Sequence, residues 1–171
     1  MIWQFILTAL SCALFFGFVV LCVCKYGLLS CYSAYGPAWH KTYPKFNVWS
    51  AVTLVTAALL IPVLLENSEG NPWQFAGFLC PAMLLFVALT PDYGTNPIAG
   101  PVHSICAGLG ALFSIVYILC VYPSLWWLLV IYYVAATVLT FIYGKWSWCF
   151  WFEMAAYLSV YTAVFVMIAV K

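Results

Sequence analysis

"VHSICAGLGALFSIVYILCVYPSLWWLLVIYYVAATVLTFIY", residues 102–143, is an apolar run whose clearest interruption is Tyr122-Pro123-Ser124. As one continuous helix it would be about 63 Å long, roughly twice the thickness of the hydrocarbon core of a bilayer. Proline cannot donate a backbone hydrogen bond, and it biases the residue before it towards an extended conformation. Two membrane-spanning helices joined by a tight turn therefore explain this run best.

The composition of the whole chain agrees with a membrane location. Of the 171 residues, 68% are hydrophobic and 5% are charged, whereas a soluble globular domain carries about 25% charged residues. Such a chain cannot cover a water-facing surface, and it is too apolar to be disordered. The net charge of +1 and the lack of arginine give no basic surface for nucleic acid. Membrane lipids are the expected partners, and nucleic acid is not.

Six segments of the chain approach the roughly 20 apolar residues that a spanning helix needs. The first lacks the positively charged start and the short apolar core of a signal peptide, so we expect a retained helix. The sequence predicts an all-α fold, a polytopic transmembrane bundle of six helices that forms a single integral membrane domain over residues 1–171. The six predicted spans are residues 2–24, 48–65, 73–90, 102–122, 124–143 and 148–170.

The lysines indicate how this bundle is oriented, because cytoplasmic connections carry an excess of positive charge. The first connection holds Lys25, Lys41 and Lys45, and the fifth holds Lys145. With six spans, these two connections and the third share one side, and Lys171 lies on the other. The sequence therefore predicts that the lysine-rich side is cytoplasmic and that both termini lie outside.

A carboxylate interrupts the sixth predicted span, in "WSWCFWFEMAAYLSV", residues 146–160. An ionised carboxylate at the centre of a membrane helix costs about 2.5–3.5 kcal/mol, so such residues usually face the bundle interior and find a partner. Glu153 shares a helical stripe of spacing four with Cys149, Tyr157 and Tyr161. The pattern is typical of a protonated glutamate that joins helices, or of a group that carries protons, anchors a ligand or acts as a general base.

Further polar groups map to the same side of the predicted bundle as Glu153. His103 begins the fourth span, Asp92 lies in the third connection, and Ser33 lies in the first. Each alone has a structural explanation, such as a helix-start anchor for the histidine or a turn residue for the aspartate. Together they indicate a pocket that faces the cytoplasm. The ligand-binding or proton-carrying candidates are Glu153, His103, Asp92, Ser33, Tyr157 and Tyr161.

Sequence spacing gives no sign of a bound metal or cofactor. The chain has no paired histidines at the spacing of a metal-binding helix, and no glycine-rich loop that would hold a phosphate or dinucleotide. The eight cysteines lie mostly in apolar runs and include no CxxC pair. We therefore expect no metal and no cofactor.

Short motifs give the chain a resemblance to a known group. They are CYSAYG after the first span, PVLLE, LTPDYG, PVHSICAG and FWFEMAAYLSVY in the sixth span. In this order they resemble small bacterial membrane proteins of the DUF998/Frag1-like type over most of the chain. The resemblance implies a six-helix bundle in the bacterial inner membrane, with Ser33, Asp92, His103 and Glu153 as candidate site residues. The start "CYS", in place of a more serine-rich loop, departs from that group.

Three functions fit these features, and they leave open whether the protein is an enzyme. The first, which needs the fewest assumptions, is binding or transport of a lipid-like or small amphipathic ligand in an intramembrane pocket that faces the cytoplasm. The second is an integral membrane hydrolase or transferase acting on lipid head groups, with His103 and Glu153 as acid and base and Asp92 orienting the histidine. The third is an oligomeric pore-forming subunit, for which a homo-oligomer would be the assembly, or a scaffold subunit for a partner.

Overall fold

Helices form the architecture of the computed structural model, which describes residues 2–42, 47–91, 93–94 and 96–170. Short helical pieces lie in the connections: α2 (Tyr35–Thr42), η1 (Tyr32–Ala34), η2 (Pro123–Leu125) and η3 (Lys145–Ser147). No strand occurs within the described ranges. The principal helices are α1 (Ile2–Tyr26), α3 (Val48–Asn67), α4 (Gln74–Ala88), α5 (Ala99–Val121), α6 (Trp126–Tyr143) and α7 (Trp148–Val170).

Local chemistry explains several of the helix boundaries. Gly27 follows α1 with a φ of 76°, a left-handed conformation that glycine adopts without strain. The side chain of Asn47 accepts a hydrogen bond from the Ser50 backbone N–H at 3.2 Å and so caps the start of α3. Pro123 separates α5 from α6, at the break that the sequence predicts. These residues turn a very apolar chain into separate helices.

Among the described residues, five helices are long and apolar enough to cross a membrane: α1, α3, α5, α6 with its preceding 3-10 turn, and α7 with its preceding 3-10 turn. The third predicted span is shorter, because α4 has 15 residues and so measures about 22 Å. It ends at Ala88, close before Pro91, whose ring disfavours helical geometry in the preceding residue. The structure confirms an all-helical bundle, with five helices of spanning length and one apolar helix below that length.

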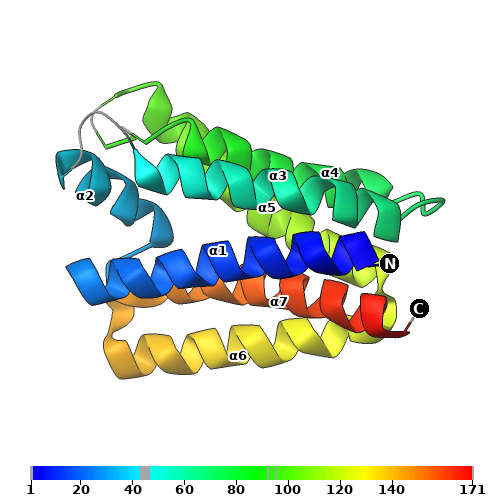
Figure 1. The fold of residues 1–171 in the computed structure, drawn as a ribbon. Coiled ribbons are helices and arrows are strands. Elements are labelled where there is room, and N and C mark those ends of the chain that lie inside the picture. The colour runs from blue at the N-terminus through cyan, green and yellow to red at the C-terminus, as the bar shows by residue number, and fades with distance from the viewer. Residues whose placement is uncertain (1, 43–46, 92, 95, 171) are drawn as a thin grey trace.

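The principal helices run antiparallel to their neighbours along the chain and form two layers (Figure 1). Helices α3, α4 and α5 form one layer, and α1, α7 and α6 form the other. Contacts of α1 with α3 and of α5 with α7 join the layers. Both termini lie at one end of the bundle, and α2 lies at the opposite end (Figure 1).

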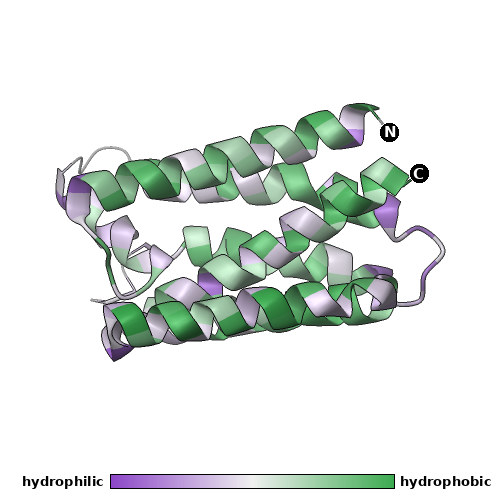
Figure 2. Ribbon diagram, turned by 90° about the horizontal axis from the view of Figure 1, so that it is seen from below, coloured by the Kyte–Doolittle hydropathy of each residue, from purple (hydrophilic) through white to green (hydrophobic). Residues whose placement is uncertain are grey.

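The outer surface of the helices is apolar. Hydrophobic residues cover most of the helix lengths, and many of the hydrophilic ones lie near the two ends (Figure 2). Large apolar side chains are exposed on the helices, among them Phe5, Phe86, Val134 and Phe141. A surface of this kind is stable in lipid and would aggregate in water. The chain therefore has the make-up of a multi-pass integral membrane protein.

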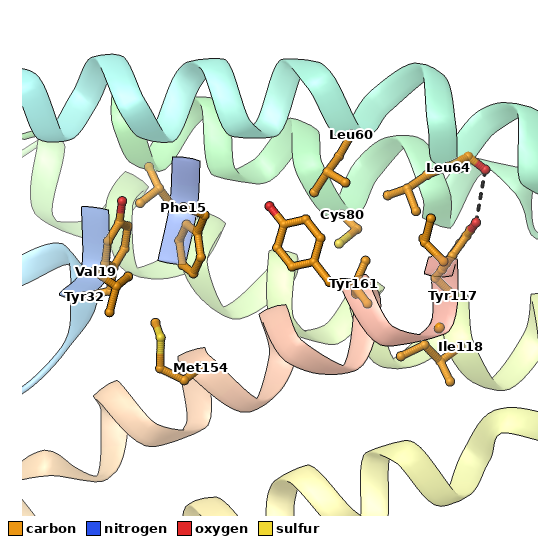
Figure 3. Packing of buried hydrophobic residues seen from close by; sticks show 14 of the residues in the cluster. Phe15, Val19, Tyr32, Leu60, Leu64, Cys80, Tyr117, Ile118, Met154 and Tyr161 are labelled. Carbon is orange, nitrogen blue, oxygen red and sulfur yellow. Dashed lines mark hydrogen bonds between the residues drawn. The ribbon is translucent and has the colours of Figure 1, made fainter. Parts of the chain in front are cut away.

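Close contact between α4 and its neighbours depends on a glycine. Tyr117 of α5 is fully buried, and its hydroxyl donates to the Leu64 carbonyl of α3 at 3.2 Å (Figure 3). A Cβ atom built on Gly77 of α4 would lie 2.8 Å from the Tyr117 ring and 3.3 Å from the Leu64 oxygen. The absence of a side chain at residue 77 thus lets three helices meet.

We expect Gly77→Ala to lower the free energy of unfolding by about 1–3 kcal/mol, since the added methyl group overpacks the Tyr117 ring. The matched control is Gly108→Ala in α5, where a Cβ would meet nothing within 4 Å and where alanine favours the helix. Both are measured by denaturant titration in mixed micelles. Equal stability of the two variants would show that α4 can move away from α5 at no cost.

Candidate functional site

The first connection is docked onto the start of α7. The Phe150 backbone N–H donates to the Ser30 carbonyl at 3.0 Å. The Tyr32 backbone N–H donates to Oε2 of Glu153 at 2.5 Å. Tyr32 is the first residue of η1, so the carboxyl group of Glu153 satisfies a backbone donor that a helix start leaves without an internal partner. Glu153 is thus a partner for the first connection as well as a polar group inside the bundle.

A small cavity of about 60 Å³ lies beside this contact, between α7 and the layer of α3, α4 and α5. Its volume is enough for about two water molecules. Polar groups are grouped where η1 meets α7, and the remaining wall is largely apolar. The lining residues that matter here are Tyr32, Ser33, Glu153, Tyr157, Ala111 and Val160.

The stripe predicted on α7 faces this cavity. Glu153, Tyr157 and Tyr161 all line it, as does Ser33 of the first connection. Figure 3 shows Tyr161 reaching from α7 towards Leu60 of α3 and Cys80 of α4, which also line the cavity. The structure therefore brings four of the six candidate residues to one place.

The two tyrosines of the stripe also hold α7 against α1. The hydroxyl groups of Tyr161 and Ser11 lie 2.7 Å apart, and Ser11 donates to the Thr56 carbonyl of α3 at 2.9 Å. The Tyr157 ring lies against Phe15 with a centroid separation of 3.9 Å. Each tyrosine therefore packs against α1 and also lines the cavity.

A cluster of polar side chains lies next to Glu153, outside the spanning helices. The sulfur of Cys31 lies 3.2 Å from the Ser33 hydroxyl. Tyr93, in the third connection, forms side-chain hydrogen bonds with Ser33 and Cys31. Burial raises the pKa of Tyr93 to about 12, so this phenol stays protonated at neutral pH. The first and third connections thus meet over the cavity.

His103 occupies a separate position at the start of α5. Its Nδ1 lies 3.1 Å from the Thr90 hydroxyl, and its ring stacks on Tyr93 at 4.2 Å between centroids and on Trp49 at 6.4 Å. The side chain is buried, Nε2 has no hydrogen-bond partner in the described part of the protein, and His103 does not line the cavity. No described hydrogen bond joins it to Glu153. Asp92, the remaining candidate, lies outside the described residues.

Sequence reasoning does not single out Tyr32, Cys31 or Tyr93 as members of the site. The partner of Glu153 is a backbone N–H 121 residues away in the chain, and spacing rules cannot reveal such a pairing. A signal exists in the density of aromatic residues in "CYSAYGPAW", residues 31–39. These rings are too many to remain in water, so the segment folds back on the bundle and buries Tyr32, Tyr35 and Trp39.

Comparison with protein-family models, curated proteins and solved structures finds no match for this chain. Within the described ranges, no group of three or more His, Cys, Asp or Glu side chains has the proximity needed to hold a metal ion. The chemistry of the site therefore has to be argued from its own geometry: one carboxyl group, two thiols and several hydroxyls at the end of an apolar cavity.

Proposed function

We propose that this multi-pass membrane protein binds a lipid-like or small amphipathic ligand between α5 and α7, with the polar head of the ligand at Glu153. The observation that carries the proposal is the cavity itself, whose lining combines the carboxyl group of Glu153 and a few hydroxyl groups with largely apolar walls. Ligand sites are typically apolar pockets with a few convergent polar groups. A carboxyl group beside Ser33 suits a head that donates hydrogen bonds, such as a hydroxyl or an ammonium group.

The cavity must widen to admit such a ligand, because about 60 Å³ is well below the roughly 300 Å³ of a typical ligand pocket. Small residues on the α5 wall give room for this movement. They are Ala107, Gly110, Ala111 and Ser114. Helix α5 packs mainly on α4, and α7 packs mainly on α6, so the two walls belong to different helix pairs. Separation of these pairs would open the cavity with each pair intact.

The proposal includes a cytoplasmic orientation for this end of the bundle and six crossings of the membrane. Lys25 lies in the last turn of α1, and Lys145 begins η3, between α6 and α7. The end of α1 and the start of α7 are at the same end of the bundle as α2, opposite both termini (Figure 1). An excess of lysine marks cytoplasmic connections. Helix α4 runs beside α3 and α5 along its length. Although α4 is short, it would cross the membrane if the bilayer is locally thinner there, or if the residues that flank α4 extend to the interface. The resemblance to the DUF998/Frag1-like proteins agrees with this topology.

The test is photolabelling of the full chain in lipid nanodiscs with a long-chain fatty alcohol that carries a diazirine in its alkyl chain. Peptide mass mapping then locates the labelled residues. We expect labels on the α5 and α7 walls, at residues such as Ala111 and Val160. Ala111→Phe fills the cavity and should reduce this labelling roughly tenfold, which corresponds to a loss of about 1.4 kcal/mol of binding free energy.

The matched control is Ala58→Phe, the same substitution at an exposed position of α3, which should leave labelling of the cavity walls unchanged. Thermal melting of each variant shows whether it is folded. Labels confined to lipid-facing residues of the wild-type protein would overturn the proposal without any variant. Equal labelling of the walls in Ala111→Phe and in the wild type would also overturn it.

A further inference from the structure

Two cysteines from distant parts of the chain meet beside the cavity. Cys31 lies between Ser30 and Tyr32, and both neighbours are hydrogen-bonded to α7, at Phe150 and Glu153. Cys149 is the second residue of α7, directly before Phe150 and one turn before Glu153. These bonds hold the Cys31 side chain against the first turn of α7.

The two thiols interact directly, and each has polar neighbours that suit thiol chemistry. A side-chain hydrogen bond joins Cys31 and Cys149, and a second one joins Cys149 and Glu153. The Ser33 hydroxyl lies 3.2 Å from the Cys31 sulfur, and the Ser30 hydroxyl donates to it at 3.9 Å. Cys31 is partly exposed at the end of the bundle, so a small reagent can reach it.

The remaining cysteines have other surroundings. Cys22 is buried and accepts a hydrogen bond from the Trp39 indole at 3.1 Å. Cys80 is buried in the wall of the cavity. Cys24 is exposed on α1. The contact between Cys31 and Cys149 therefore combines a second thiol, a nearby carboxyl group and access from outside.

We propose that Cys31 and Cys149 are a redox-active pair that forms a reversible disulfide, which fastens the first connection to α7. This inference does not depend on ligand binding in the cavity. Thiol–disulfide exchange requires a thiolate as the attacking group. Hydrogen bonding from the Cys149 thiol, helped by the two serine hydroxyls, lowers the pKa of Cys31 to about 5 against the opposing effect of burial. Cys31 is therefore the attacking sulfur.

The oxidant is a low-molecular-weight disulfide, and the exchange proceeds in two steps. The Cys31 thiolate attacks one sulfur of the reagent, the reagent's S–S bond breaks, and one half leaves as a thiolate that takes up a proton. Cys149 then gives up its proton to water and attacks the Cys31 sulfur of the mixed disulfide. The second half of the reagent leaves and takes up that proton. The protein dithiol is oxidised to a disulfide, and the reagent is reduced to two thiols.

The test equilibrates the full chain in nanodiscs with mixtures of reduced and oxidised glutathione, followed by acid quenching, alkylation of the free thiols and peptide mapping. We expect a peptide that links residues 31 and 149, with both thiols disappearing together and returning in excess reduced glutathione. The exposed Cys24 should instead take up glutathione. Oxidation that modifies Cys24 and yields no linked peptide would overturn the proposal, as would a link from Cys31 to any other cysteine.

Two variants separate this pair from general thiol reactivity. Cys149→Ser should stop the reaction at Cys31 bound to glutathione, whereas Cys106→Ser, a change in α5, should form the 31–149 link as the wild type does. A 31–149 link that is lost in Cys106→Ser would contradict the assignment. Peptide mapping of the wild-type protein alone shows whether the 31–149 disulfide forms. The proposal can therefore be tested even if a variant does not fold.

Alkylation kinetics provide a second measurement of the same site. Within the described residues, the titratable groups that act on Cys31 come from every element around it. They are Cys149 and Glu153 of α7, Tyr35 of α2, Tyr93 of the third connection and His103 of α5. With a pKa of about 5, the thiolate is present above that pH and is lost below it. Between pH 6 and 8 the alkylation rate should change less than about twofold, whereas the rate of a free cysteine with a pKa of about 8.5 rises roughly 75-fold. A rise equal to that of free cysteine would contradict the role of Cys31 as the attacking sulfur.

Discussion

Replacing Trp49 with alanine is expected to destabilise the protein by about 3–5 kcal/mol, the range for truncating a fully buried aromatic residue. Trp49 is 0% exposed at the start of α3. A Cβ on Gly36 of α2 would lie 3.0 Å from its indole ring. The ring also lies 5.6 Å from Tyr32 and stacks on His103 at 6.4 Å, measured between centroids. One side chain thus connects α2, η1, α3 and α5.

Two control variants identify the cause of this loss. Trp49→Phe keeps an aromatic ring and removes an indole N–H that is buried without a hydrogen-bond partner in the described part of the chain, so we expect a much smaller effect. Trp126→Ala removes a tryptophan that is 56% exposed on α6 and should have little effect on the free energy of unfolding. Unfolding in mixed micelles measures all three. A loss for Trp126→Ala as large as that for Trp49→Ala would show that tryptophan contacts with the micelle dominate.

Much of the fold follows from two sequence features, apolar length and proline position. A run of 42 residues cannot be one membrane helix, and Pro123 divides it where the structure does. The same rules overestimate the third span, because apolar composition continues to Leu89 while the helix ends at Ala88, ahead of Pro91. The first connection illustrates a second limit. Its aromatic residues indicate burial, yet only the folded chain shows that they cover one end of the bundle.

Only the α7 side of the candidate site could be predicted from the sequence. The spacing of Glu153, Tyr157 and Tyr161 places them on one face of a helix, and all three line the cavity. The other side is formed by the first and third connections, whose positions depend on backbone hydrogen bonds and ring stacking between distant segments. Local patterns carry no information about these contacts. For the same reason the sequence does not reveal that Cys31 and Cys149 meet.

The docking of the first connection therefore rests on three different interactions. Trp49 supplies apolar packing, Glu153 accepts a backbone hydrogen bond, and Cys149 offers a thiol to Cys31. The first two hold the segment in place at all times, whereas the third depends on the surrounding redox conditions. A segment held in this way has a stability that can be raised by oxidation and lowered by loss of the carboxyl group.

Removal of that carboxyl group is expected to have the second large effect. In Glu153→Leu the Tyr32 N–H loses its acceptor in a buried setting, and an unsatisfied buried group costs about 1–3 kcal/mol. Glu153→Gln keeps an oxygen at the same reach and should retain most of the stability. Hydrogen exchange at the Tyr32 amide should become faster in Glu153→Leu than in Glu153→Gln, because exchange reports the opening of this one hydrogen bond.

Glu66→Leu is the matched control for the change of charge and polarity, since Glu66 is exposed near the end of α3. It should leave both the free energy of unfolding and exchange at Tyr32 unchanged. An increase in stability for Glu153→Leu would show that the cost of keeping a carboxyl group within the bundle exceeds the value of the bond to Tyr32. Glu153 would then have a functional role and no stabilising one, because a polar group whose removal stabilises a protein does not contribute to its folding.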